Sequence, residues 1–585
     1  MMQRKLQTRT IPPFGAGFFR SASRFARIGD GAPGGKAQSL LVAHDALASH
    51  LGSDTFPGLE IDVPRSVVIG TDVFDAFMAE NHLAEIAFSD ASDAEIADAF
   101  QRAKLPAEVS ADLQVLVDEA RGPLAVRSSS LLEDALYRPF AGVYETKMTP
   151  NNQPNGASRR QRLIEAIRLI YAATYFRAAK SYIRATDHDP SVEKMAVLIQ
   201  EVAGAARHGR FYPDVSGVCR SYNFYPSGRA RPEEGVVNLA LGLGKTIVDG
   251  AMTWIYSPAR PKAPPPFASV EELLRQTQTE FWAVNLAPPA ARDPQAETEY
   301  LVKSDLSAAE ADGTLSLVAS TYDALSDRLT PGLGARGPRA INFAPLLELE
   351  RFPLNRMVGA LLRACEDAVG SAVEIEFALT LPASDRPCPA RAALLQVRPL
   401  VVCSEQVEIS PEEMRRDDVL LASTRVMGNG TDRAIRDVVY VKPTSFESRH
   451  TREIEQELER VNAPLSAERR RYLLLGFGRW GSCDPWLGIP VHWGQISGAG
   501  AIVESTLPNM CVEPSQGSHF FHNISSFRVN YFCVNHRSRP PVDWEWLENQ
   551  QAEAETQFVR HVRLPRPLLM KVDGRTGRGA IWRAA

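Results

Sequence analysis

The sequence has few cysteines, and no two of them form a C-x-x-C pair. All seven lie after residue 218, at irregular spacing and in odd number. This distribution fits neither a zinc site nor a framework of disulfides. We therefore expect the chain to work in a reducing, cytoplasmic environment.

Long apolar runs and a strong excess of either charge are also missing. No run approaches the roughly 20 residues that a membrane-spanning helix needs. The formal net charge is −5, which argues against a chain-wide surface for nucleic acid. Neither a membrane nor a nucleic acid is therefore predicted as a partner.

The first residues of the chain carry basic side chains but no acidic ones. Residues 1–27 hold six arginines and lysines, without the apolar stretch that a secretory signal requires. We interpret residues 1–23 as a flexible basic leader.

The 585 residues leave room for three or four domains. Helical and strand-like segments alternate early and strands cluster later, which predicts an α/β or α+β fold. Predicted helices cover 37–51, 71–82, 107–120 and 158–186, the last with the basic polar face of a surface helix. Predicted strands cover 194–202, 216–224, 235–244, 372–380 and 392–402.

Two regions differ in composition from the rest. Residues 258–350 are rich in proline and alanine, which favours a linker or an extended excursion. After about residue 405, tryptophan, glycine and histidine become frequent. Residues 405–585 are therefore predicted to form a smaller, mixed C-terminal domain.

A glycine-rich loop, GDGAPGGK, precedes the first predicted helix and ends in Lys36. Backbone amides and a lysine at a helix start favour an anion such as phosphate. The spacing matches neither a Walker A motif nor a dinucleotide fingerprint. Taken alone, such a loop is more often a simple turn.

A second candidate is the strand-like run that ends in Arg127, followed by three serines and Glu133. A capping turn explains the serines and Glu133. It does not explain Arg127, and a guanidinium at a strand end can fork onto phosphate oxygens. A third candidate, GLGKTIVDG, places Lys245 at a turn after a strand.

The fourth candidate is a pair of late strands. Glu374 and Glu376 share one face of the first strand, and Gln396 and Arg398 share one face of the second. A hairpin would place the carboxylates opposite the amide and the guanidinium. Such oxygens suit a Mg²⁺ ion that bridges phosphates. The alternative is a structural ion pair across the strands.

Eight short segments, taken together, carry a resemblance. They are GGKAQSL, VRSSSLLED, FAGVYET, MAVLIQEV, SGVC, GLGKTIVDG, EIEF and LLQVRPL. Their order and approximate spacing resemble the nucleotide-binding domain of phosphoenolpyruvate synthase and pyruvate, phosphate dikinase, over roughly residues 24–402. The resemblance implies an ATP-grasp fold in which two lobes, 24–190 and 191–404, enclose ATP and Mg²⁺.

The same resemblance implies roles for single residues. The implied nucleotide-binding residues are Lys36, Arg127, Gln200, Lys245, Glu376, Gln396 and Arg398. Lys36 and Arg127 are also implied to act in catalysis, as cations on the phosphates. Glu376 and Gln396 are implied Mg²⁺ ligands, and Gln200 is implied to lie beside the adenine.

The chain departs from the family in two respects. Lys245 stands where the family usually has glutamate, and no GG-x-x-SH-A-like motif marks the family's mobile phosphohistidine domain. The C-terminal residues resemble segments of other stand-alone proteins that carry this nucleotide-binding domain. Among them, His519 is a candidate phosphoryl acceptor because a neutral imidazole is a competent nucleophile, although a loop histidine is more often structural.

These observations favour an ATP- and Mg²⁺-dependent phosphotransferase of the dikinase type. Its acceptor would be a small molecule, a partner protein or His519. Two alternatives remain: a regulatory module that binds nucleotide without catalysis, and one half of a two-chain enzyme with a separate phosphohistidine-domain partner.

Overall fold

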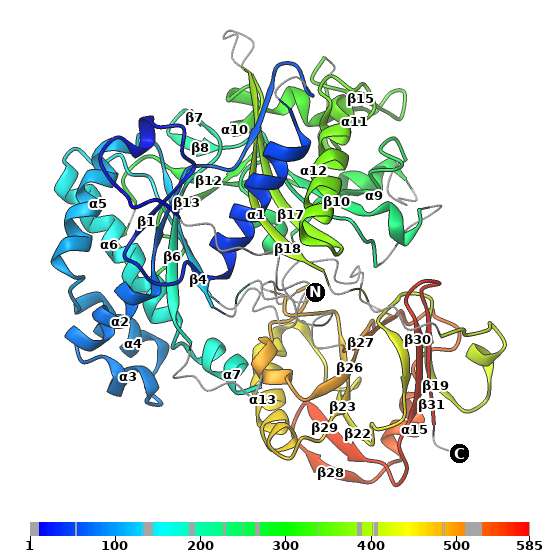
Figure 1. Ribbon diagram of the computed structural model, residues 1–585. Coiled ribbons are helices and arrows are strands. Elements are labelled where there is room, and N and C mark those ends of the chain that lie inside the picture. The colour runs from blue at the N-terminus through cyan, green and yellow to red at the C-terminus, as the bar shows by residue number, and fades with distance from the viewer. Residues whose placement is uncertain are drawn as a thin grey trace.

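The computed structural model describes residues 11–583 with short gaps. The gaps are 53–54, 132, 134–143, 186–192, 225, 227–229, 250, 264–268, 276, 290, 335, 383–388, 401, 403–406, 483, 485, 509, 511–523 and 525–528. The fold is of the mixed α/β class, as predicted (Figure 1). Within the described ranges, none of the helices has the length and apolar character to cross a membrane.

The first sheet has five strands in the order β1-β3-β6-β4-β5. The strands are β1 (Phe25–Ile28), β3 (Ser66–Ile69), β6 (Met195–Glu201), β4 (Leu124–Ser130) and β5 (Thr146–Thr149). Only β1 and β3 run parallel to each other. The inner strands β3 and β6 are largely apolar and buried because both faces are covered by other elements, whereas the inner strand β4 carries Arg127 and three serines.

Seven helices accompany the first sheet. They are α1 (Gly34–His50), α2 (Thr71–Glu80), α3 (Ala84–Phe88), α4 (Asp93–Arg102), α5 (Ala107–Glu119), α6 (Gly156–Ala173) and α7 (Arg177–Ala185). Val67 and Ile69 on one face of β3 share a core with α2, α5 and α6, whereas Val68 on the other face shares a core with α1 and the second sheet. The sheet is therefore a middle layer.

The second sheet has six strands in the order β11-β10-β9-β17-β18-β2. They are β11 (Trp254–Tyr256), β10 (Val236–Ala240), β9 (Val215–Arg220), β17 (Val373–Thr380), β18 (Ala390–Pro399) and β2 (Leu59–Asp62). The helix α12 (Leu354–Val369) contacts both β17 and α1. The two sheets exchange strands across the predicted lobe boundary at residue 190, because β2 belongs to the second sheet and β6 to the first.

The proline-rich region is folded rather than a linker in the residues that the structure describes. One sheet, in the order β13-β12-β8-β7, contains β13 (Leu301–Asp305), β12 (Glu280–Asn285), β8 (Arg210–Tyr212) and β7 (Ala205–Arg207). Another contains β15 (Arg328–Pro331), β14 (Ala319–Asp323) and β16 (Arg339–Ile341). The short helices are α8 (Lys245–Val248), α9 (Val270–Arg275), α10 (Leu306–Ala311) and α11 (Ala344–Leu347). The apolar residues between the prolines bury themselves in the core of the second sheet, which is why this region folds.

The C-terminal unit is built on two sheets. One has the order β19-β31-β30-β21, with β19 (Val419–Ser423), β31 (Arg578–Trp582), β30 (Leu569–Asp573) and β21 (Asn429–Asp432). The other has the order β20-β27-β26-β23-β22-β29-β28, with β20 (Val426–Met427), β27 (Asn530–Val534), β26 (Ala499–Ser505), β23 (Tyr472–Phe477), β22 (Asp437–Val441), β29 (Val559–Arg563) and β28 (Ala552–Glu555). A two-stranded sheet joins β24 (Arg479–Trp480) and β25 (Gly488–Ile489), and the helices include α13 (Thr451–Ala467) and α15 (Trp544–Glu548).

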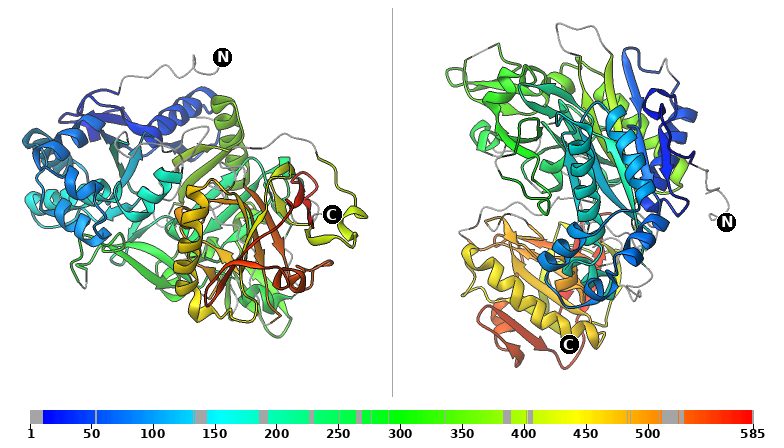
Figure 2. Two further views of the ribbon diagram at one scale, coloured as in Figure 1. Left: turned by 90° about the horizontal axis from the view of Figure 1, so that it is seen from below. Right: turned by 90° about the vertical axis from the view of Figure 1, so that its left-hand side faces the viewer.

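The C-terminal unit lies beneath the two large N-terminal sheets (Figures 1 and 2). The helix α7 contacts the 3-10 helix η7 (Trp493–Ile496) of that unit. One continuous apolar core contains residues of both the first sheet and the C-terminal unit.

Most predicted elements are confirmed, and two further interpretations are corrected. The helix predicted over 158–186 is broken near Thr174 into α6 and α7, and the second half of α6 is buried rather than solvated. Residues 11–23 of the predicted flexible leader instead pack on the first sheet. Phe14 N donates to Arg27 O of the strand β1 region and Arg27 N donates to Pro12 O, while Ile11 and Phe18 are buried.

Candidate functional site

The hairpin of β17 and β18 has the register that the sequence predicts. Glu374 pairs with Arg398 and Glu376 pairs with Gln396, so the four side chains share one face. On the other side of β17, Glu374 pairs with Arg220 of β9. The prediction of a carboxylate pair opposite an amide and a guanidinium is confirmed.

A β-bulge interrupts the hairpin next to these residues. Glu376 pairs with Gln396, but the next residue, Phe377, pairs with Leu394, so Leu395 is left over on β18. Bulges of this kind re-aim neighbouring groups and are frequent beside functional sites. Here the carbonyl oxygen of Leu395 accepts a hydrogen bond from Arg127 at 2.8 Å.

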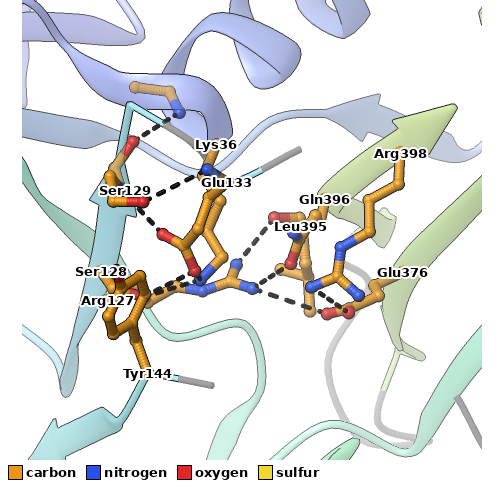
Figure 3. Close-up of polar contacts among 12 residues, drawn as sticks. Lys36, Arg127, Ser128, Ser129, Glu133, Tyr144, Glu376, Leu395, Gln396 and Arg398 are labelled. Carbon is orange, nitrogen blue, oxygen red and sulfur yellow. Dashed lines mark hydrogen bonds and ion pairs between the residues drawn. The ribbon is translucent and has the colours of Figure 1, made fainter. Parts of the chain in front are cut away.

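Arg127 crosses from the first sheet to the second (Figure 3). Its Nη2 donates to Gln396 Oε1 at 2.6 Å, and Glu376 Oε2 lies 3.6 Å from the same nitrogen. Its Nη1 also donates to Gln200 Oε1 at 3.3 Å. The strand β4 runs on to Ser130, so Arg127 lies in the middle of its strand and not at the end that the sequence predicts. The structure brings Gln200, Glu376 and Gln396 around it.

Guanidinium and carboxylate groups alternate along the second sheet. Arg398 lies 3.6 Å from Glu374 and 3.8 Å from Glu376, and Arg220 Nε donates to Glu374 at 2.6 Å. Together with Arg127, three guanidinium groups face two carboxylates, which leaves one net positive charge. Such a cluster is suited to an anion. Arg220 was not predicted, although it is the last residue of β9 and a strand-end position is the signal by which the sequence analysis selected Arg127.

Lys36 lies close to this cluster in the fold, but its ammonium group is bound to other side chains of the protein. Its Nζ donates to Glu133 Oε1 at 2.8 Å and to Ser128 Oγ at 2.9 Å (Figure 3). The side chain is 7% exposed. Ser130 N donates to Glu133 Oε2, so the capping turn predicted from the serines and Glu133 is present. Glu133 thus both caps the turn and neutralises Lys36.

The glycine-rich loop before Lys36 encloses a carboxylate of the protein itself. Asp30 N donates to Asp72 Oδ2 at 2.7 Å. A Cβ atom on Gly31 would lie 2.6 Å from Asp72 Oδ1, so this carboxylate fills the space that the missing side chain leaves. Burial opposes the charge of Asp72, but backbone N–H groups of Asp30 and Gly31 outweigh it and lower the pKa of the carboxyl. The backbone amides that the sequence predicts to face a phosphate therefore bind the Asp72 carboxylate in this structure.

Lys245 lies in a second cluster, with acidic neighbours. Its Nζ is 3.0 Å from Asp249 and 3.6 Å from Glu297, and it lies over the ring of Trp282. Burial and the charge of Glu297 raise the pKa of Glu145 to about 7. Lys245 therefore offsets carboxylates here.

A buried lysine that the sequence analysis did not predict anchors the segment that contains Glu297. Lys147 on β5 forms an ion pair with Glu299 at 2.7 Å and donates to the carbonyl oxygens of Asp293, Pro294 and Ala296. No motif marks this role, because carbonyl acceptors leave no trace in a sequence. The contacts fasten residues 293–299 onto the first sheet.

The predicted acceptor His519 lies outside the described residues. In the described part of the C-terminal unit, Asp437, Glu553 and His561 form a group with metal-ligand spacing. Arg470 forms ion pairs with both Asp437 and Glu553, and His561 hydrogen-bonds to Asp437. A guanidinium thus already occupies the position between these carboxylates, which makes the group a structural ion cluster.

Comparison with protein families gives one match. Residues 32–418 match the family described as pyruvate phosphate dikinase, AMP/ATP-binding domain. A search of curated proteins finds no match.

Proposed function

The chain belongs to the family of the pyruvate phosphate dikinase AMP/ATP-binding domain, and from that membership we propose that it is an ATP- and Mg²⁺-dependent phosphotransferase. In this proposal the two large sheets are the cores of two ATP-grasp lobes, and the nucleotide phosphates bind where Arg127 reaches from one sheet to the other. The acceptor would be a small molecule, a protein or His519.

One observation carries the proposal. Arg127 is anchored on three groups of the opposite sheet, and it gives the cluster of three guanidinium groups and two carboxylates its net positive charge. Preorganised cations of this kind stabilise the charge of a phosphoryl group as it moves. Gln396 and the carbonyl of Leu395 fix the orientation of the guanidinium, so little reorganisation is needed when an anion arrives.

The donor set around Arg127 also fits a magnesium ion. The Glu376 carboxylate is 19% exposed, and its ion pairs at 3.6 and 3.8 Å are longer than hydrogen bonds. Mg²⁺ is usually held by one or two carboxylates together with substrate phosphates, and it would neutralise phosphate charge there. We propose Glu376 as its ligand. Gln396 remains a predicted ligand, although its Oε1 accepts from Arg127 in this structure.

The burial and pairing of Lys36 favour a second candidate function. This cation is buried and paired with Glu133, so it reaches a phosphate only if that ion pair opens. A regulatory module that binds nucleotide without turnover fits this arrangement. So does one half of a two-chain enzyme, in which a phosphohistidine-domain partner completes the site.

Incubation with Mg²⁺ and ATP labelled separately at the β and γ phosphates tests these functions. AMP together with labelled protein indicates dikinase chemistry, and ADP without labelled protein indicates direct γ-transfer or hydrolysis. Bound but unconsumed ATP supports the regulatory module, and consumption only after a partner is added supports the two-chain enzyme.

The site itself is tested by Arg127→Gln. We expect at least a tenfold loss of ATP affinity, because a charge-assisted hydrogen bond to phosphate contributes about 1.5–3 kcal/mol. Arg275→Gln, at an exposed arginine of α9, is the matched control. Equal ATP affinity in Arg127→Gln and the control would disprove the site.

A further inference from the structure

The polar face of the second sheet continues beyond the predicted nucleotide residues onto β9 and β10. Glu376 pairs with Val218 of β9, and Val218 pairs with Asn238 of β10. Residues directly opposite on antiparallel strands share a face, so Asn238 lies on the same face as Glu376. Arg220, two residues after Val218, extends this face by one more row.

Asn238 is a buried polar side chain whose role the fold does not explain. It is 6% exposed, and its amide has no hydrogen-bond partner among the residues that the structure describes. The amide atoms are not fully enclosed and keep a small accessible area. Because a buried amide is normally hydrogen-bonded, this unpaired and still accessible amide is open to a ligand. The neighbouring cluster of Val218, Ala240 and Ile247 shows that apolar residues of α8 cover the sheet right beside it.

Arg220 supplies a charge next to this amide. Its Nε donates to Glu374, and this bond fixes the plane of the guanidinium. Its two Nη groups have no hydrogen-bond partner within the described ranges, and the side chain is 11% exposed. Asn238 and Arg220 are diagonal neighbours on adjacent strands, a spacing that long side chains can bridge.

We propose that Arg220 and Asn238 form an oxyanion-binding site, a second one beside that of Arg127. A guanidinium fork and an amide N–H group are donors that match a phosphate or carboxylate. The nearby Glu374 is shared by Arg220 and Arg398, so its charge is compensated. Two strand spacings, roughly 10 Å, separate β9 from β18, so the site takes a different group from the one at Arg127.

The inference deepens the proposed function. The assignment of the oxyanion to the phosphates of ATP rests on that function. The oxyanion is either the far phosphates of ATP or a separate anionic substrate. Binding of AMP, of ATP and of inorganic phosphate in the presence of AMP, measured by calorimetry on the full chain, separates these sources. The variants are Asn238→Ala and Arg220→Gln.

If the far phosphates occupy the site, both variants lose at least tenfold in ATP affinity and bind AMP as the wild type does. If a separate anion occupies it, both bind ATP normally and lose at least tenfold in affinity for inorganic phosphate. Unchanged binding of all three ligands in Asn238→Ala would overturn the proposal. Should the wild-type chain bind phosphate but no nucleotide, the proposed function fails while this site stands, and binding of neither overturns both.

Asn342→Ala is the matched control for a structural role. Asn342 is also 6% exposed, but it accepts hydrogen bonds from Ser320 Oγ and Ala344 N. We expect Asn342→Ala to lower the melting temperature and leave anion affinity unchanged. Asn238→Ala should leave the melting temperature unchanged, because it removes no hydrogen bond within the described protein, and should lower the anion affinity.

Discussion

Lys36 and Arg127 both meet carboxylates of the protein itself, but in different settings. The partner of Lys36, Glu133, is 2% exposed, and breaking a buried pair of this kind costs about 3–5 kcal/mol. Arg127 and Glu376 are more accessible and lie 3.6 Å apart. In the proposed function, a phosphate therefore engages Arg127 at a lower cost than Lys36, which mainly fixes α1 to the turn after β4.

The carboxyl group of Glu145 leads to a prediction about pH. Burial and the charge of Glu297 raise the pKa of Glu145 to about 7, above the value of 4.5 for an unperturbed group. The folded state therefore holds a proton that the unfolded state releases, and the free energy of unfolding falls as pH rises between these two values. Glu145→Gln should remove this part of the slope and stabilise the protein at pH 8.

Denaturant unfolding at several pH values from 4 to 8 measures this effect. Glu80→Gln, at an exposed glutamate of α2, is the control and should keep the wild-type slope. The assignment fails if Glu145→Gln loses stability with rising pH as steeply as the wild type does.

The residues of the site differ in how far the sequence reveals them. Glu376, Gln396 and Arg398 could be found because alternation along a strand fixes which side chains share a face, and Arg127 because a capping turn explains its neighbours but not the guanidinium. Asn238 could not be found, since one asparagine in an apolar strand has no pattern. Its place beside Glu376 depends on the pairing of β9 with β17, which are far apart in the chain.

At the scale of elements, the start of α1 is fitted closely against β4. Gly34 has a φ of +75°, and a Cβ atom there would overlap the carbonyl oxygen of Ser129. Ser129 Oγ also donates to Pro33 O and accepts from Ala37 N, so α1 is attached to β4 at its first turn. This attachment sets the position of the loop and of Lys36.

Gly34→Ala should therefore displace α1. We expect a loss of at least about 1–3 kcal/mol in stability, since overpacking and a left-handed conformation both oppose the new side chain. Gly122→Ala is the control, because a Cβ atom there meets nothing within 4 Å. Urea unfolding of the two variants compares them, and equal midpoints would contradict the close fit.

Regular helices and strands were predicted from the sequence, but the irregularities within them were not. Periodicity located α1, α2 and α5 and the strands of the β17–β18 hairpin, because each has one repeating apolar pattern. The bulge at Leu395 was not predicted, since no glycine or proline marks it. The break between α6 and α7 was missed for the same reason.

In the whole molecule, the C-terminal unit is attached to the first sheet through α7. A Cβ atom on Gly494 would overlap the Cβ of Ser181 on α7, so backbone and helix touch there. The apolar core continues from the first sheet's helices into residues such as Tyr472 and Ile496 of the C-terminal unit. A shared core of this kind makes the two parts unfold together.

Gly494→Val should uncouple the unfolding of the C-terminal unit from that of the first sheet. The added side chain cannot fit against Ser181, so we expect the single calorimetric transition of the wild type to divide into two, the C-terminal unit melting apart from the nucleotide-binding part. Gly334→Val is the control, because a Cβ atom there meets nothing within 4 Å, and it should keep one transition. One undivided transition in Gly494→Val would show that contacts other than the one between Gly494 and Ser181 hold the C-terminal unit in place. Two transitions already present in the wild type would mean that the shared core does not couple the parts, and that the C-terminal unit is able to move independently of the nucleotide site.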